Sequence, residues 1–279
     1  MSFISSNQSR QVRKEIRRIY SKNFIPVHSQ DTIIKIGSLL ENRQGETVRL
    51  DGLEIPAEYT KSVHSKFKTN KNLLSRKIKS ASVLLAGEKI GPKKVEEDQT
   101  GLKYAFSNSK QMVMLLRGTH RTRLSNFPKF RNYVLENYTS GDLSPKVFVV
   151  DEVLESDQFF LQFGAESSGE LGIMLDLPSA KYNPMAAEKA KITYASQNSI
   201  GFSVDGRDGG VLAYRVSSIK LLREKLNSRY LDRMSYERRD ADVLEAISVA
   251  DRKAIAKDEG FAFVDKTDAF LLEHEEMQD

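Results

Sequence analysis

Six short runs in the second half of the chain alternate apolar and polar residues, and this period of two constrains the fold more than any other feature. Leu or Ile occupies every second position of the run 171–177. Turn-forming Ser, Gly, Asn and Asp separate most of the runs, and consecutive strands joined by short turns pair antiparallel. We therefore expect a strongly twisted, largely antiparallel sheet. Its strands are 146–154, 158–165, 171–177, 189–196, 199–205 and 210–222.

The remaining segments predict an α+β fold with flanking helices. Apolar residues recur at helical spacing in 9–22 and 127–141, and the second segment ends at Gly141. Helical patterns return at 219–230 and 242–258, which gives a C-terminal helical tail. Further extended segments are 24–27, 32–40, 47–55 with a hairpin turn at Asp51-Gly52, and 102–106, while 111–117 fits a buried strand or a short helix.

Charge divides the chain unevenly. Residues 240–279 hold 4 basic and 12 acidic residues (net −8), which leaves 39 basic and 26 acidic residues (net +13) for 1–239. We therefore predict a basic domain at 1–232 and an acidic C-terminal tail at 233–279. The polar segment 235–242 predicts an exposed hinge between them, with Arg238 and Arg239 as candidate protease cleavage positions.

Several classes of activity lack their residues. The chain has no Cys, and its four His residues lack metal-ligand spacing. No stretch matches a phosphate-binding loop or a GxSxG nucleophile turn. No apolar run is long enough to span a bilayer as a helix, and the N-terminus does not resemble a signal peptide. We expect a soluble, cytoplasmic binding protein rather than an enzyme, with no cofactor and no metal.

Acidic residues on neighbouring predicted strands leave one catalytic alternative. A magnesium-dependent nuclease could use these acids with Lys146 or Lys191; they are Asp151, Glu152, Glu155 and Asp157, with Glu166, Glu170 and Asp176. Acids on the outer face of a half-exposed sheet are more often an ordinary solvated surface, and we expect that role for them.

The stretch 61–94 holds ten Lys and Arg residues and one acid. Near anionic lipid each contributes about 1 kcal/mol of attraction, so this stretch favours a membrane surface. It also fits a nucleic-acid surface, although Phe67 is its one aromatic residue for base stacking. In the acidic tail, Phe261, Phe263, Phe270 and Leu271 predict a segment that docks on the basic body. An ordinary C-terminal helical subdomain fits the same pattern.

Several stretches resemble the bacterial gasdermins, a family of pore-forming proteins. KVFVVDEVLESDQFFLQFGAESSGELGIMLDLP (146–178) resembles the family's strand–turn–strand–strand run, which leads through a Ser/Gly turn into an LD-P sequence. KITYASQNSIGFSV (191–204) is similar to the passage before the family's closing strand, here 212–221. Residues 19–40 loosely fit its first helix and strand. Many bacterial members begin with a lipidated Cys that this chain lacks, and 61–101 matches the family's Gly-rich stretch poorly.

The resemblance implies an inactive cytoplasmic monomer restrained by its C-terminal segment. Release, for example by a protease, frees a body that binds anionic lipid at the inner membrane, forms homo-oligomers and inserts β-hairpins. Such pores serve cell death and anti-phage defence. The expected lipid-binding residues are Arg13, Arg17, Arg18, Lys61, Lys66, Lys68, Lys71, Arg76, Lys77 and Lys79. The expected membrane-inserting residues are Leu171, Ile173, Leu175, Leu177, Ile192, Tyr194, Ile200, Phe202 and Val204. A nucleic-acid-binding regulatory protein is the alternative.

Overall fold

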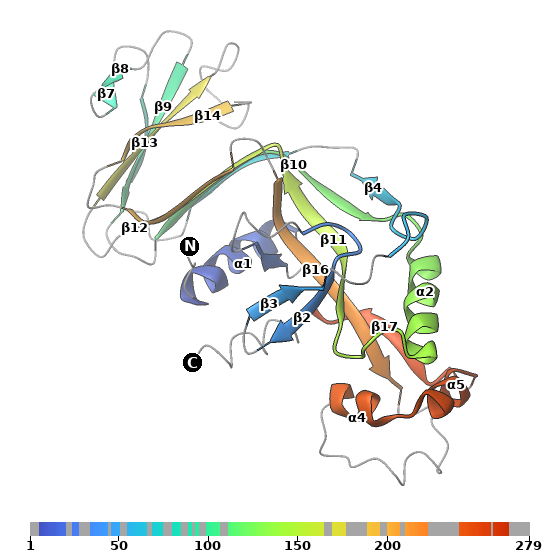
Figure 1. Ribbon diagram of the computed structural model, residues 1–279. Helices are drawn as coiled ribbons and strands as arrows, with labels where there is room; N and C mark the ends of the chain where they lie inside the picture. Colours follow the sequence, from blue (N-terminus) through green and yellow to red (C-terminus); the bar gives the residue numbers. More distant parts are fainter. Residues whose placement is uncertain are drawn as a thin grey trace. The chain divides into compact units, whose positions relative to one another are not determined.

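A computed structural model describes most of the two sheets and four helices (Figure 1). The described residues are 6–20, 24–27, 34–43, 46–50, 55–65, 69–74, 80–84, 89–90, 93–94, 99–106, 111–164, 169–176, 189–195, 200–206, 210–222, 240–257 and 259–267. The chain divides into two compact units built from alternating segments. Unit 1 comprises Met1–Lys22, Ser65–Arg121 and Leu154–Leu212, and unit 2 comprises Asn23–His64, Thr122–Val153 and Ala213–Asp279.

Strands dominate the described residues. The helices are α1 (Ser6–Tyr20), α2 (Phe127–Ser140), α4 (Asp240–Ala246) and α5 (Val249–Lys257). The strands of the first half are β1 (Ile25–Pro26), β2 (Leu39–Arg43), β3 (Glu46–Arg49), β4 (Ser62–His64), β5 (Thr69–Leu74), β6 (Ser80–Leu84), β7 (Lys89–Ile90), β8 (Lys93–Lys94), β9 (Gln99–Phe106) and β10 (Met112–Leu124). Those of the second half are β11 (Phe148–Ser156), β12 (Gln158–Gly164), β13 (Gly169–Asp176), β14 (Lys189–Ala195), β15 (Ile200–Gly206), β16 (Gly210–Leu221) and β17 (Phe261–Asp265).

The strands form one large sheet, one small sheet and a two-stranded ribbon. The large sheet runs in the order β1-β16-β11-β10-β12-β15, with β17 added beside β16 and β2 beside β11. The small sheet has the order β14-β13-β9-β6, and β7 pairs with β8. Every described register is antiparallel. The predicted α+β class and largely antiparallel sheet are therefore confirmed.

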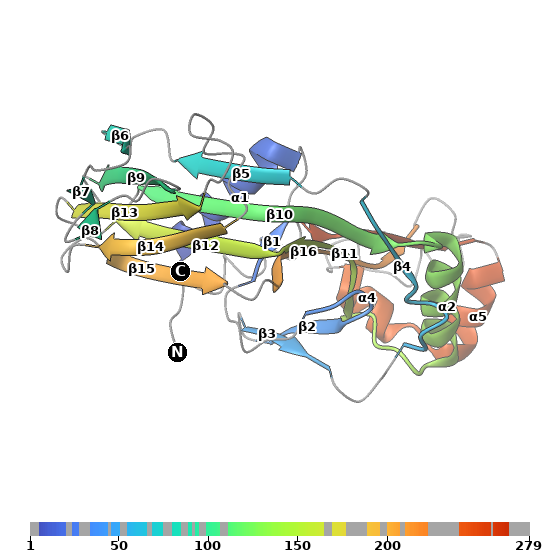
Figure 2. The same cartoon turned by 90° about the horizontal axis from the view of Figure 1, so that it is seen from above.

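Unit 2 is organised around α2. Asn126 caps its first turn by accepting a hydrogen bond from the Lys129 amide at 3.0 Å, and Gly141 ends it in the left-handed conformation. The buried face of α2 carries Phe130, Val134 and Tyr138. Figure 2 shows α5 beside α2, and both contribute to a core that also includes β17. The predicted helix at 127–141 is confirmed to within one residue.

Unit 1 contains α1, the small sheet and the paired strands β12 and β15. Val12 and Ile16 are buried on α1, as its predicted apolar face requires, while Arg17 and Arg18 are exposed. The run 111–117 proves to be the buried start of β10 rather than a short helix. No helix among the described residues is long and apolar enough to cross a membrane.

Some predicted elements differ from the structure. The predicted extended segment 32–40 is interrupted by a turn at Gly37. The φ of Gly37 is +80°, which a continuous β-strand does not allow. The expected helix at 219–230 is wrong for 219–221, which continue β16, and its remainder lies mostly outside the described residues. The expected helix at 242–258 is two helices separated at Ile247 and Ser248. The Asp51-Gly52 turn lies outside the described residues.

Candidate functional site

The C-terminal segment, described at 240–257 and 259–267, packs against α2 through Tyr138. The Tyr138 hydroxyl donates to the carbonyl of Leu244 at 2.9 Å, and the Arg252 guanidinium lies 4.4 Å from the centre of the Tyr138 ring. Arg252 also donates to the carbonyls of Tyr138 and Ile247, both at 3.1 Å. Both side chains are buried, and burial raises the pKa of Tyr138 to about 12, partly offset by the Arg252 charge. These directional contacts define one position of α4 and α5 on α2.

Two predicted docking residues complete this contact. Phe261 meets Tyr138 edge-on with ring centres 5.1 Å apart, and Phe263 meets Phe130 with ring centres 5.9 Å apart. Both lie on β17, which pairs with β16 from Leu221↔Phe261 to Ser217↔Asp265. Phe130, Tyr138, Leu244, Arg252, Ile255, Phe261 and Phe263 are named the C-terminal cluster below. Phe270 and Leu271 lie outside the described residues, and so do Arg238 and Arg239 of the predicted hinge.

A row of charged residues joins β11, β16 and β17. Arg215 donates to Glu152 at 2.9 Å and also pairs with Asp265 of β17. The neighbouring Ser217 hydroxyl donates to Asp151, whose pKa is raised chiefly by burial, against the lowering effects of Ser217 and Arg215. The expectation that these acids form a solvated face is therefore wrong for Asp151 and Glu152. The residues that pair with Asp151 and Glu152 lie more than 60 residues away in the sequence, so no local sequence pattern predicts these contacts.

The other acids of that expectation lie elsewhere. Asp157 is exposed, and Glu155 is half-buried with one carboxylate oxygen 3.4 Å from Nε2 of His120. Lys146 pairs with Glu245 at 2.6 Å between two exposed side chains, which contributes little to stability.

The small sheet buries two cross-strand pairs of apolar residues. Leu171 lies opposite Tyr104, and Ile173 lies opposite Leu102, and all four side chains are at most 5% exposed. The alternate positions hold Gly172 opposite Lys103. One face of the β9–β13 pair is therefore apolar, whereas the opposite face is mixed and carries the buried Gly172 and Met174 beside the half-buried Lys103.

Burial also affects two polar groups near this pair. Tyr104 is buried, which raises its pKa to about 12, with the Arg117 charge acting in the opposite sense. Arg117 lies on β10, is 2% exposed and donates to its neighbouring Leu116 carbonyl at 2.9 Å. Burial lowers the pKa of Arg117. The sequence gives no local sign of this buried cation, because Arg117 simply ends an apolar run.

The predicted membrane-inserting residues fall into two sheets. Leu171, Ile173 and Leu175 lie on β13 and Ile192 and Tyr194 on β14 of the small sheet. A register shift between Gly172 and Ile173 sets Ile192 opposite Ile173 but Tyr194 opposite Gly172. Ile200, Phe202 and Val204 lie on β15, which pairs with β12 in the large sheet. Leu177 lies outside the described residues.

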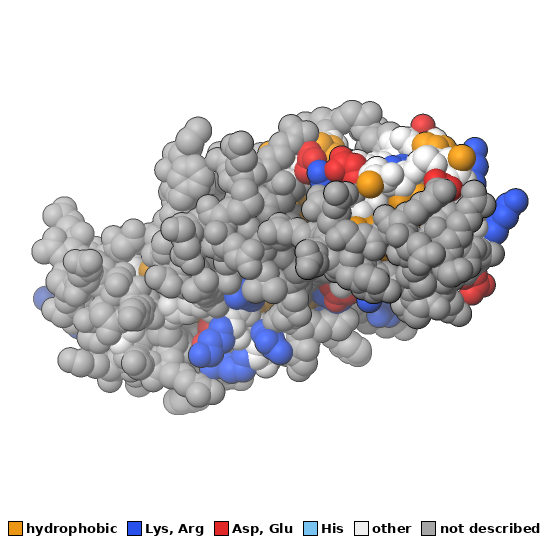
Figure 3. All heavy atoms as spheres, turned by 90° about the horizontal axis from the view of Figure 1, so that it is seen from below, with side chains coloured by type: hydrophobic (Ala, Val, Ile, Leu, Met, Phe, Trp, Pro, Cys, Tyr) orange, Lys and Arg blue, Asp and Glu red, His pale blue; other side chains and the backbone are white. Residues whose placement is uncertain are grey.

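The predicted lipid-binding residues are described in part. On α1, Arg17 and Arg18 are exposed, Arg13 is half-buried, and Arg18 pairs with the buried Glu15 at 3.1 Å. Lys61 is exposed, and Lys71 is placed on β5 by its backbone. Figure 3 shows a group of Lys and Arg side chains on one face of the molecule. Lys66, Lys68, Arg76, Lys77 and Lys79 lie outside the described residues.

The comparisons with known proteins include a distant structural neighbour. No protein-family model matches the chain, and no curated protein matches it. A solved structure of a bacterial gasdermin from Bradyrhizobium tropiciagri is similar over 67% of this chain and 78% of that chain, with 12% identity and a TM-score of 0.29. A likeness of this size carries no argument, so the proposals below rest on the residues of this chain.

Proposed function

We propose that this chain is a gasdermin-like pore-forming protein restrained by its C-terminal segment. The small sheet is the observation that carries the proposal. Its strands come in two antiparallel pairs from separate stretches of the chain, β6 with β9 and β13 with β14. Two such pairs, each with alternating character, are what a pore made from two inserted β-hairpins requires of the soluble chain.

The lengths of these strands suit the same purpose. β9 and β13 have 8 residues each and β14 has 7. A strand that crosses a bilayer needs about 9–11 residues, so these three would extend by a few residues at their ends, and β6, with 5 residues, would have to about double in length. The face with Leu102, Tyr104, Leu171 and Ile173 would meet lipid, and the opposite face, with Lys103, Gly172 and Met174, would line the pore.

Restraint would come from the C-terminal cluster together with β17. In this proposal a protease cuts at Arg238 or Arg239, the C-terminal segment leaves, and the basic residues of α1 and the 61–79 stretch bind anionic lipid at the inner membrane. Homo-oligomers then form there and kill the cell as a defence against phage. The role is not enzymatic and uses no cofactor.

Because the C-terminal segment is part of the folded core, the test of restraint has to keep this segment in the protein while it folds. A truncation at 240 would remove β17 and five of the seven residues of the C-terminal cluster, so loss of folding would obscure the result. Cleavage of the intact chain at a protease site inserted near Arg239 avoids this. A Lys220→Cys/Ala262→Cys variant adds a lock, because these residues are Cα partners on β16 and β17 and antiparallel partners lie at disulfide distance.

The experiment measures dye release from anionic liposomes. We expect no leakage from the intact chain, leakage after cleavage, and no leakage from the cleaved, oxidised lock until a reductant is added. Because the chain has no other Cys, the reduced lock is its own control. Leakage from the cleaved lock under oxidising conditions would refute restraint by this segment. No leakage from any cleaved form would refute the pore.

Nucleic-acid binding remains the second candidate because of the 61–94 charge. Binding of DNA or RNA that weakens steeply with salt, together with no leakage, would favour it.

A further inference from the structure

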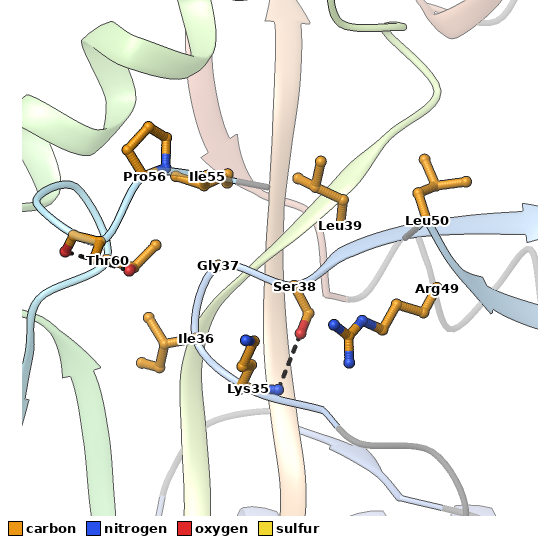
Figure 4. Close-up of a pocket in the computed structure, with 11 residues that line it drawn as sticks. Lys35, Ile36, Gly37, Ser38, Leu39, Arg49, Leu50, Ile55, Pro56 and Thr60 are labelled. Carbon is orange, nitrogen blue, oxygen red and sulfur yellow. Dashed lines mark hydrogen bonds between the residues drawn. The ribbon is translucent and has the colours of Figure 1, made fainter. Parts of the chain in front are cut away.

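A cavity of about 410 Å³ lies within unit 2, outside the regions discussed above. It is bordered by the turn before β2, by the end of β3 and by residues 55–60 (Figure 4). Small-molecule sites in proteins occupy about 300–1,000 Å³, so the cavity has the volume of a small ligand.

The walls of the cavity are fixed by tight backbone contacts. Gly37 donates its amide to the Val150 carbonyl of β11 at 2.8 Å. A Cβ on Gly37 would lie 2.5 Å from Cγ2 of Thr60, so glycine allows these two walls to meet. The Ser38 hydroxyl accepts from the Lys35 amide at 3.0 Å, which closes the turn. The cavity is therefore part of the folded unit rather than a gap between loose loops.

The lining combines two cations with an apolar wall. Lys35 and Arg49 supply positive charge, and no carboxylate is among the lining residues that the structure describes. Ile36, Leu39, Leu50, Ile55 and Pro56 supply apolar surface. In Figure 4 the guanidinium of Arg49 points toward Ser38, and Leu39 and Leu50 lie on the side away from Ile36.

The neighbouring hydroxyls have their own bonds. Thr60 donates to the Ala57 carbonyl at 3.5 Å, and Ser38 is held by the Lys35 amide. Lys35 and Arg49 carry the positive charge that an anion would meet in this cavity. A guanidinium and an ammonium together match a carboxylate or a phosphate monoester.

We propose that this cavity binds a small anionic amphiphile: a carboxylate or phosphate head held by Arg49 and Lys35, with a short apolar chain against Ile36, Leu50 and Ile55. The site goes beyond the proposed pore and needs no membrane. Its ligand binds the intact, resting chain.

Isothermal titration of the full chain with octanoate and octyl phosphate tests this, with octanol and octyltrimethylammonium as neutral and cationic probes. We expect the two anions to bind and the other two probes to bind at least tenfold more weakly. Arg49→Gln should weaken octanoate binding about tenfold or more, because it removes a charge-assisted hydrogen bond. Lys35 is exposed, so Lys35→Gln tests the second cation without disturbing the core.

Lys61→Gln is the matched control, since it removes an exposed lysine that does not line the cavity. Octanoate affinity should be unchanged in this variant. Equal affinity for octanol and octanoate, or an equal loss in Lys61→Gln and Lys35→Gln, would overturn the proposal. Because no liposome is present, the outcome is independent of whether the chain forms pores.

Discussion

The C-terminal cluster and the small sheet are both buried, yet they are held together in different ways. In the cluster, side chains from α2, α4, α5 and β17 meet through a hydroxyl–carbonyl bond, a stacked guanidinium and edge-on rings. In the small sheet, backbone hydrogen bonds between strands fix the arrangement, and the apolar side chains contact one another as cross-strand pairs. The cluster specifies one arrangement, whereas a ladder can exchange partners and keep its hydrogen bonds.

This difference suits the two roles proposed for them. A restraint needs contacts that fail together once the segment leaves, and an inserting hairpin needs strands that can be extended and paired again. The predictions below test whether the contrast in stability is real.

The largest effect is expected at Tyr138, which joins most of the cluster. Tyr138→Ala removes the ring that Arg252 and Phe261 contact, so it should cost about 3–5 kcal/mol of unfolding free energy. Tyr138→Phe removes only the bond to Leu244 and should cost about 0.5–1.5 kcal/mol. Urea unfolding, with hydrogen exchange of 240–267 and of β13 followed separately, measures both. Equal losses of unfolding free energy in the two variants would show that the Tyr138 ring does not stabilise the cluster.

Arg252 should come next. Arg252→Met keeps much of the volume but removes the charged donor to the carbonyls of Tyr138 and Ile247, at an expected cost of about 1.5–3 kcal/mol. Lys253→Met changes the exposed neighbour and should stay within about 0.5 kcal/mol. Thermal and urea unfolding of the pair give the comparison. Similar losses in both variants would mean that the charge on α5, not the contact, matters.

One substitution made in both regions sharpens the contrast. Ile255→Val in the cluster and Ile173→Val in the small sheet each remove one buried methylene, at about 0.5–1.5 kcal/mol. We expect Ile255→Val near the upper end, because the aromatic neighbours leave little room to relax, and Ile173→Val near the lower end. The reverse order in urea unfolding would break the comparison.

The smallest effect concerns Asp151 and depends on pH. Burial raises the pKa of its carboxyl, so the folded chain holds this proton more tightly than the unfolded chain. Its contribution to stability is therefore full below the ordinary Asp pKa of about 4 and is lost as pH rises through the raised value. Asp151→Asn keeps an acceptor for Ser217 and cannot ionise. Wild type should lose stability relative to Asp151→Asn as pH rises above about 4 in urea unfolding; a constant difference would contradict this.

Local signals made part of this molecule predictable. α2 begins after a capping Asn, carries Pro128 in its first turn and ends at Gly141, so sequence alone places it. The strands from β11 to β16 could be predicted because apolar and polar residues alternate within each of them. The basic body and acidic tail follow from counting charges.

Pairing between distant segments could not be predicted in the same way. Alternation shows that β14 and β15 are strands, but not that β14 joins β13 while β15 joins β12. Phe261 and Phe263 were expected to dock, yet the strand they form depends on a partner that begins about 50 residues earlier in the sequence. The stacking of Arg252 on Tyr138 has no sequence signature at all.

The division of the chain into alternating segments also sets the order in which the protein is made. Unit 1 receives its last segment by Leu212, whereas the core of unit 2 waits for β17, which ends at Asp265. At a synthesis rate of about 5–20 residues per second, roughly 3–10 seconds separate these two points. A nascent chain therefore holds every segment of unit 1 before the C-terminal strand has left the ribosome. Any restraint that depends on β17 therefore begins only after Asp265 has been translated.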